Sequence, residues 1–177
     1  YDDATPPATP TVTLTQSVSP GSVVVNSSLN YTIGGTGRIS GGSSLVKQGT
    51  GRLSITTNNN FNGGSTISGG VVDLEGTGVL GSRGIKLSGG QLHAGAAGNF
   101  NLNNDIVVTG GGNALSNDNV GSQTLNVRGR ISGSGNVVLA NDAGAGTGVT
   151  GAVNGIDLFG DNSGFNGSVT FGASGNP

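Results

Sequence analysis

The 177-residue sequence contains no cysteine, no methionine and no tryptophan. Without cysteine, the chain has neither a disulfide nor a thiolate metal site. Without methionine it lacks an initiator residue, which indicates a processed or excised piece and is consistent with an exported protein whose signal has been removed. The aromatic residues are two tyrosines and five phenylalanines, too few to predict a cleft that stacks sugar rings.

Charge is also scarce, since charged residues make up 9% of the chain and the net charge is −2. A chain with this balance has no basic patch for nucleic acid. No apolar run reaches the roughly 18 residues of a membrane-spanning helix, so we expect no membrane insertion by this segment. No long window shows helical spacing of apolar residues, and glycine does not recur at every third position as it does in collagen.

Glycine is the abundant residue, with 37 copies. Between the glycines lie short apolar groups, such as Val23–Val25, Leu53 with Ile55, and Ile106–Val108. This pattern predicts short strands joined by sharp corners. Corners favour residues that tolerate positive φ, glycine first and asparagine next. If such strands stack coil upon coil, they pair backbone groups that a glycine-rich chain cannot otherwise bury. The sequence therefore predicts an all-β protein, a β-solenoid.

Asparagines at corresponding corners of stacked coils can form side-chain ladders, although an ordinary turn role explains any single one. The candidates for a ladder are Asn58, Asn59, Asn60, Asn99, Asn101, Asn103 and Asn104.

Internal repeats support the solenoid. "GRISG" begins at residues 37 and 129, and "FNG" begins at residues 61 and 165. The second copy is therefore longer than the first, and the glycine-rich segment Asn141–Gly151 is the expected insertion. On a finer scale, "ISGG" begins at residue 67 and "LSGG" at residue 87. The spacing between these two motifs is within the length of one solenoid coil.

One stretch resembles a known family, the autotransporter-associated β-strand repeat of bacterial passenger domains. The matching residues are Leu45, Lys47, Gly49, Gly51, Leu53, Ile55, Asn60, Phe61, Gly63, Gly64, Thr66, Ile67, Gly69, Gly70 and Leu74. A weaker copy lacks the lysine and contains the insertion, with Gly133, Gly135, Val137, Leu139, Asn162, Phe165, Gly167 and Val169. The resemblance implies a right-handed parallel β-helix displayed outside the cell. It implies no particular activity, because such passengers include adhesins, proteases and plain stalks.

The N-terminal stretch differs from the rest, because four of the five prolines precede the first glycine, Gly21. We therefore divide the chain into an extended Pro/Thr-rich arm or linker, residues 1–22, and a β-solenoid domain, residues 23–177. The segment Val12–Thr15 alternates like a strand. It belongs either to a linker or to an arm that adds a strand to another subunit.

His93 is the only histidine, so a Ser-His-Asp triad would have to use it. Asp73 and Glu75 lie about one coil away and can stack near it. We expect His93 to face outward from a strand, on the surface and beside a carboxylate, in a role that is not catalytic.

The other motifs do not match the patterns of a calcium-binding or phosphate-binding site. The oxygen-rich loops Ser116–Ser122 and Gly160–Gly167 lack the patterns of known calcium loops, and Asx turns explain both. The segment Asn141–Gly148 has no Gly-Lys-Ser/Thr and no helix after it, so it is not a phosphate loop. The sequence predicts no catalytic, cofactor-binding or metal-binding residue, and no enzyme.

The resulting functional prediction is a structural extracellular β-solenoid, a subunit of a cell-surface or matrix fibre, secreted and bacterial. Its partners would be other copies of itself, joined head to tail by strand addition. The assembly residues would be Val12, Thr13, Leu14, Thr15, Val169 and Phe171. The alternative is a monomeric adhesin or binding passenger domain of an autotransporter, whose partner would be a host surface or polysaccharide and whose best candidate site is the Asn141–Gly151 loop. A weaker alternative is a polysaccharide-acting β-helix enzyme.

Overall fold

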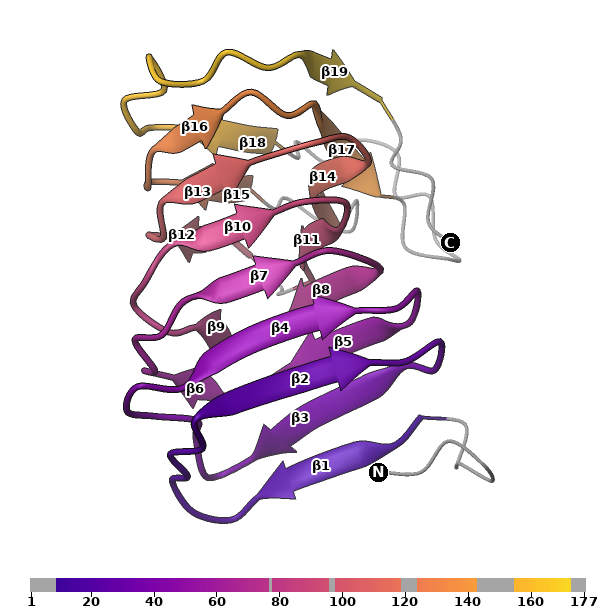
Figure 1. Cartoon of the computed structure of the whole chain (residues 1–177), viewed down its shortest axis with the longest axis vertical. Helices are drawn as coiled ribbons and strands as arrows, with labels where there is room; N and C mark the ends of the chain where they lie inside the picture. The colour runs from indigo at the N-terminus through magenta and orange to yellow at the C-terminus, as the bar shows by residue number, and fades with distance from the viewer. Residues whose placement is uncertain (1–8, 77, 96–97, 119–123, 143–154, 173–177) are drawn as a thin grey trace.

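The computed structural model describes residues 9–76, 78–95, 98–118, 124–142 and 155–172. All regular structure in these residues is β-strand, and the strands stack as coils of a solenoid (Figure 1). In Figure 1 the near strands run left to right and the far strands right to left while the chain climbs, so the coil is right-handed. The predicted β-solenoid is confirmed. The described residues include no helix long and apolar enough to cross a membrane.

The coils have three faces, and all strand pairs in the described residues are parallel. The eight-stranded sheet consists, in spatial order, of β1 (Thr11–Leu14), β3 (Tyr31–Gly35), β5 (Arg52–Ile55), β8 (Val71–Leu74), β11 (Gln91–Ala94), β14 (Asn113–Asp118), β17 (Val137–Asp142) and β19 (Val169–Phe171). The six-stranded sheet consists of β16 (Ile131–Gly133), β13 (Ile106–Val108), β10 (Ile85–Leu87), β7 (Ser65–Ile67), β4 (Ser44–Gln48) and β2 (Ser22–Asn26). The third face holds the pair β6 (Asn58–Asn59) and β9 (Val79–Leu80), and the sheet β12 (Phe100–Leu102), β15 (Thr124–Val127) and β18 (Gly155–Leu158).

The strand register gives the length of each coil. In the six-stranded sheet Leu45 pairs with Ser65, and Ser65 pairs with Ile85, so these coils have the spacing that separates "ISGG" from "LSGG", as predicted. In the eight-stranded sheet Val137 pairs with Val169, which makes the last coil the longest along this sheet. The extra residues lie between these two strands, where the insertion was predicted. The Asn141–Gly151 loop begins in β17, and its remainder lies outside the described residues.

Apolar side chains at equivalent inward positions form columns inside the solenoid. One column runs along the eight-stranded sheet through Tyr31, Leu53, Val72, Leu92, Leu115 and Leu139, all buried. Each fully buried aliphatic side chain stabilises the fold by about 2 kcal/mol. The interior holds only the side chains that point inward from each coil. Hydrogen bonds between the backbones of neighbouring coils therefore supply the rest of the stability.

Glycine alone takes the left-handed backbone at the corners. Every residue with positive φ in the described part of the chain is glycine, so the expectation that asparagine shares this role is wrong. Gly51 shows a second use of glycine, because a Cβ there would overlap the carbonyl oxygen of Leu29 in the coil below.

An asparagine side chain joins neighbouring coils by hydrogen bonds to their backbones. Asn59 Oδ1 accepts from the Ile39 amide at 2.8 Å, and its Nδ2 donates to the Val79 carbonyl at 3.0 Å. It thus bonds to the backbone of both neighbouring coils.

A charged side chain lies inside the solenoid. Lys47 is 1% exposed and points inward from β4. Its ammonium donates to the carbonyl oxygens of Gln48 at 2.7 Å, Gly49 at 3.1 Å and Gly69 at 3.2 Å. Burial lowers its pKa to about 8, so the group is still protonated at neutral pH. Because Gly69 belongs to the next coil, Lys47 joins two coils at one corner.

Candidate functional site

A polar column crosses the outward side of the eight-stranded sheet. Ser54, Asp73, His93 and Ser116 occupy the same register position in β5, β8, β11 and β14. They alternate with the inward leucines and valines, so their side chains leave the sheet on its outer side. Asp73, His93 and Ser116 are nevertheless buried, with exposed fractions of 5%, 3% and 0%. The prediction that His93 faces away from the core is confirmed, but the expected surface position is wrong.

The imidazole of His93 is held in a hydrogen-bonded chain. Its Nδ1 lies 2.8 Å from Ser116 Oγ, and its Nε2 lies 3.0 Å from Asp118 Oδ1. Gln91 Nε2 donates to Ser116 Oγ at 2.7 Å. An ionised Asp118 only accepts, so Nε2 carries a proton, and Ser116 donates to Nδ1 when the ring is neutral. These bonds join the neighbouring strands β11 and β14 on the outer side of the sheet.

An acidic group adjoins this chain of hydrogen bonds. Asp73 Oδ2 forms an ion pair with Arg52 Nη1 at 2.7 Å. Burial raises the pKa of Glu75, and the charge of Asp73 and a hydrogen bond between the two carboxyl groups raise it further, against the opposing effects of Ser54 and Arg52. Gly95 leaves room for the carboxylates, since a Cβ there would lie 2.7 Å from Asp73 Oδ1.

The cluster contains the residue types of a catalytic triad, namely serine, histidine and aspartate, joined by hydrogen bonds. Sequence reasoning placed Asp73 beside His93, and the register confirms this, yet the hydrogen-bonded partners of the ring are Ser116 and Asp118. Ser116 is fully buried, and its oxygen also accepts from Gln91. Among the described residues no group of three His, Cys, Asp or Glu side chains is arranged to hold a metal ion. The arrangement fastens neighbouring coils together.

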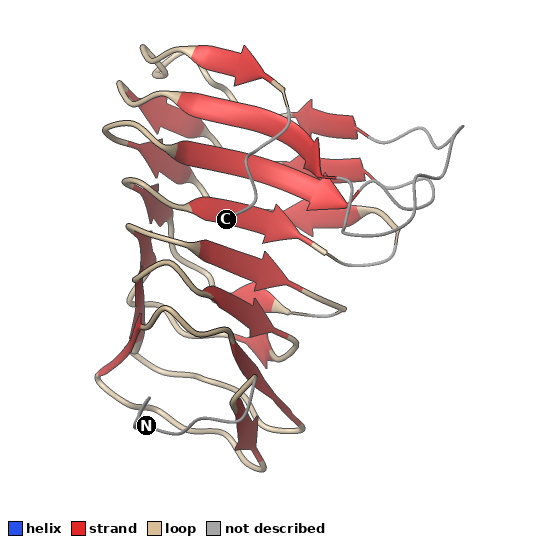
Figure 2. Cartoon of the chain, turned by 90° about the vertical axis from the view of Figure 1, so that its right-hand side faces the viewer, coloured by secondary structure: helices blue, strands red, loops and turns tan. Residues whose placement is uncertain are grey.

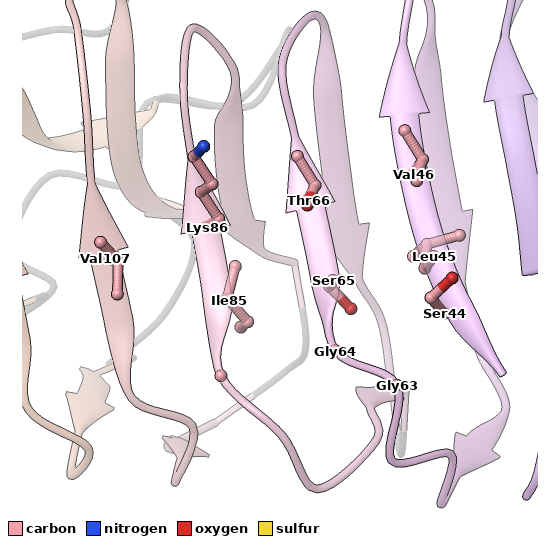
Figure 3. A pocket seen from close by; sticks show the side chains of 11 residues that line it. Ser44, Leu45, Val46, Gly63, Gly64, Ser65, Thr66, Ile85, Lys86 and Val107 are labelled. Atoms are coloured by element: carbon pink, nitrogen blue, oxygen red, sulfur yellow. The ribbon is translucent and has the colours of Figure 1, made fainter. Parts of the chain in front are cut away.

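The outer side of the six-stranded sheet carries an open groove of about 400 Å³ (Figure 3). Its lining includes Gly64 and Gly84, which have no side chains and directly precede the paired residues Ser65 and Ile85. Figure 3 shows side chains from four consecutive strands along one wall, namely Val46, Thr66, Lys86 and Val107. The groove crosses the strands and runs along the solenoid axis. No aromatic residue lines it, so it offers an elongated, mostly apolar surface with one ammonium group.

The predicted assembly residues lie at opposite ends of one sheet. Val12, Thr13 and Leu14 form β1 with Thr11, and Thr15 follows directly. Val169 and Phe171 lie in β19. β1 and β19 are the two outermost strands of the eight-stranded sheet and lie at opposite ends of the molecule in Figures 1 and 2. Within the predicted arm, β1 is extended, as expected, and pairs in parallel with β3 of its own chain, Val12 beside Ile33.

Two comparisons with known proteins found matches to the sequence of this chain. Residues 45–74 match the family model of the passenger-associated-transport-repeat. This stretch is similar to a passenger-associated transport repeat. Over 155 residues the chain is also 31% identical to the adhesin BmaC autotransporter of Brucella suis biovar 1. That alignment covers 86% of this chain and 4% of the relative, so the chain spans a small part of the protein it resembles. No solved structure matches the chain.

The passenger repeat runs from β4 to β8, about one and a half coils. Its lysine is the buried Lys47, and its second glycine is Gly51, which allows the close approach of the coil below. The weaker second copy keeps part of the same bonding. The backbone N–H of Asn62 donates to the Gly41 carbonyl. At the matching corner, the backbone N–H of Asn166 donates to the Gly133 carbonyl. The stretch that carries the resemblance therefore corresponds to a structural unit that the chain repeats.

Sequence reasoning missed Ser116 and Asp118 as hydrogen-bond partners of His93, and Gln91 as a donor to Ser116. Val71 pairs with Gln91 and Gln91 pairs with Ala114, so the second of these two coils is longer than the first. A fixed spacing therefore does not find the partners on β14. A signal that could have found them is the placement of Ser116 and Asp118 two residues apart, which puts both on the face of the strand opposite to Leu115.

Proposed function

We propose that this chain is part of an extracellular autotransporter passenger that acts as an adhesin at the bacterial surface. The observation that carries the proposal is the likeness to an adhesin autotransporter along 86% of this chain. The passenger repeat at residues 45–74 supports the same location. A stack of parallel coils is a rigid rod, which suits a role in holding a binding surface away from the cell.

The buried polar cluster supports a role without catalysis. A catalytic serine must meet its substrate, and Ser116 has no exposed surface. Polysaccharide cleavage by two carboxyl groups needs both beside an open cleft, whereas Asp73 is 5% exposed and paired with Arg52. We therefore assign this cluster to stability and the adhesive contact to the lateral faces.

Adhesion by the purified chain tests the proposal. Beads coated with the chain should attach to host cells or to matrix proteins more than beads coated with albumin do. The double variant Val46→Glu/Val107→Glu places charge in the groove of the six-stranded sheet and should reduce attachment. Val24→Glu is the matched control, because Val24 precedes Val46 in register and lies outside that groove.

Two results would contradict the proposal. Beads coated with the unaltered chain would attach no better than albumin beads to any surface offered. Alternatively, the chain would cleave a polysaccharide, and His93→Ala or Asp73→Ala would abolish that cleavage, which is the behaviour of an enzyme. The fibre-subunit expectation gains no support from the comparisons, since the relative is described as an adhesin.

A further inference from the structure

Two cations without an acidic partner border the groove of the six-stranded sheet. Lys86 lies on its wall and is exposed, and Arg83, also exposed, directly precedes the lining residue Gly84. The Cβ of Arg83 lies 3.8 Å from the position that a Cβ on Gly64 would take, so this side chain starts beside the groove. Among the described residues, neither Arg83 nor Lys86 forms an ion pair. The groove therefore carries positive charge that the described chain does not neutralise.

An acidic residue that adjoins the groove is already paired. The carbonyl oxygen of Asp105 would lie 3.2 Å from a Cβ on Gly84. Its carboxylate Oδ1 accepts from the backbone N–H of Arg130 at 2.8 Å, and its Oδ2 lies 3.9 Å from Arg130 Nη2. The charge of Asp105 is therefore offset by Arg130 in the next coil, and a net positive charge remains beside the groove.

The rest of the groove wall is aliphatic or bears hydroxyl groups. Val107 is 42% exposed, and Val46 and Thr66 are half-buried (Figure 3). Aliphatic side chains of a ligand can pack against these valines. The four strands that form the groove, β4, β7, β10 and β13, each have a partner strand on both sides. The groove therefore lies within the solenoid and not at one end of it.

We propose that this groove binds an extended acidic segment of another protein, with aliphatic side chains on Val46 and Val107 and a carboxylate held by Arg83 and Lys86. The inference rests on the proposed function, because it names the partner of the adhesive face. A guanidinium can bind a carboxylate through two parallel hydrogen bonds, and complementary charge selects an acidic partner. The volume of about 400 Å³ is in the range of ligand sites, about 300–1,000 Å³.

The composition of the groove favours a peptide over a polysaccharide. No aromatic residue lines the groove, so the flat stacking surface that sugar rings use is missing. Its exposed surface is mostly apolar, which suits valine, leucine or isoleucine side chains better than hydroxyl-rich sugars. The occupant that satisfies both the cations and the valines is therefore a segment that combines acidic and aliphatic residues.

Fluorescence anisotropy with a matched pair of peptides tests the charge contact. One short fluorescein-labelled peptide has single glutamates flanked by valines, and its twin has glutamine in place of every glutamate. The unaltered chain should bind the glutamate peptide about tenfold more tightly than the twin, the effect of two exposed charge contacts. Added salt should reduce this difference, because exposed charges are screened.

Substitution of the two cations tests whether they make the contact. Arg83→Gln and Lys86→Gln should each weaken binding of the glutamate peptide by about threefold and leave binding of the twin unchanged. Arg38→Gln is the matched control, because Arg38 is exposed and loses the same charge but does not line the groove. In the double variant Arg83→Gln/Lys86→Gln, the two peptides should bind equally, since neither cation remains to distinguish them. Circular dichroism establishes that each variant folds.

The proposal is overturned by any of three results: a glutamate peptide that binds no more tightly than its twin, a double variant that still distinguishes the two peptides, or an Arg38→Gln control that loses as much affinity as Arg83→Gln and Lys86→Gln. It is overturned equally if the chain binds hyaluronan, an acidic polysaccharide, through Arg83 and Lys86 and does not bind the peptide.

The adhesion assay separates this inference from the proposed function. Coated beads that attach to cells, together with peptides that bind equally, would overturn the inference alone. Charge-dependent peptide binding by a chain whose beads attach to no surface would overturn the proposed function alone.

Discussion

At the scale of the single residue, Lys47 is the clearest case of a side chain that joins coils. Its ammonium serves three carbonyl oxygens that the thin interior cannot otherwise satisfy. Lys47→Met keeps much of the apolar volume but leaves these acceptors without a donor. We expect it to lower the free energy of unfolding by about 1–3 kcal/mol in urea titrations. Lys86→Met, on the outer side of β10 two strands away in the same sheet, should change it by less than about 0.5 kcal/mol. Equal effects of the two substitutions would contradict this role.

The pKa of Lys47 also predicts how stability depends on pH. The unfolded chain has the ordinary lysine pKa of 10.5, and burial lowers the pKa in the fold to about 8. Between these values the unfolded state binds more protons, so the free energy of unfolding rises with pH. This group contributes no change below pH 8, and its full rise of about 3 kcal/mol is reached near pH 10.5. Urea unfolding at several pH values should show the rise in the unaltered chain, and the Lys47→Met variant should lack it.

Glu75 predicts a dependence of opposite sign. Its pKa in the fold is raised above 4.5, mainly by burial and then by Asp73. As pH rises above 4.5 the folded state holds its proton longer than the unfolded state does, so ionisation of Glu75 works against the fold. Glu75→Gln should therefore be more stable than the unaltered chain at neutral pH, and thermal unfolding curves of the two should converge below about pH 4.5. A variant that is less stable at neutral pH would show that the carboxylate makes a net favourable contact.

At the scale of the element, the corners set how closely coils can stack. Gly51 has no strain in its φ, but a Cβ there would collide with the Leu29 carbonyl oxygen. Gly42 has nothing within 4 Å of the position of a Cβ and no positive φ. Gly51→Ala should lower the free energy of unfolding by more than about 2 kcal/mol, because backbone must move. Gly42→Ala should leave it unchanged or raise it by up to about 1 kcal/mol. The same loss at both positions would indicate that stacking distance is not the cause.

The strands and corners were predictable from the sequence because their causes are local. Alternation of Leu53 with Ile55 gives an inward face, and glycine gives the sharp turns. The polar column was not predictable in full, because it depends on the number of residues in each coil. A coil with the spacing of the "ISGG" and "LSGG" motifs places Asp73 beside His93, but a longer coil is needed to bring Ser116 there. The burial of His93 likewise depends on what surrounds the outer side of the sheet, and alternation within one strand carries no information about that.

At the scale of the whole molecule, each coil contacts only its neighbours along the axis, so stability is nearly a sum of coil and interface contributions. Central strands such as β8 have a partner on each side, whereas β1 and β19 have one. In hydrogen exchange of a dilute sample, the amides of β8 and β11 should therefore be protected longest, and those of β1 and β19 should exchange first. Equal protection along the chain would show instead that the solenoid opens as one cooperative unit.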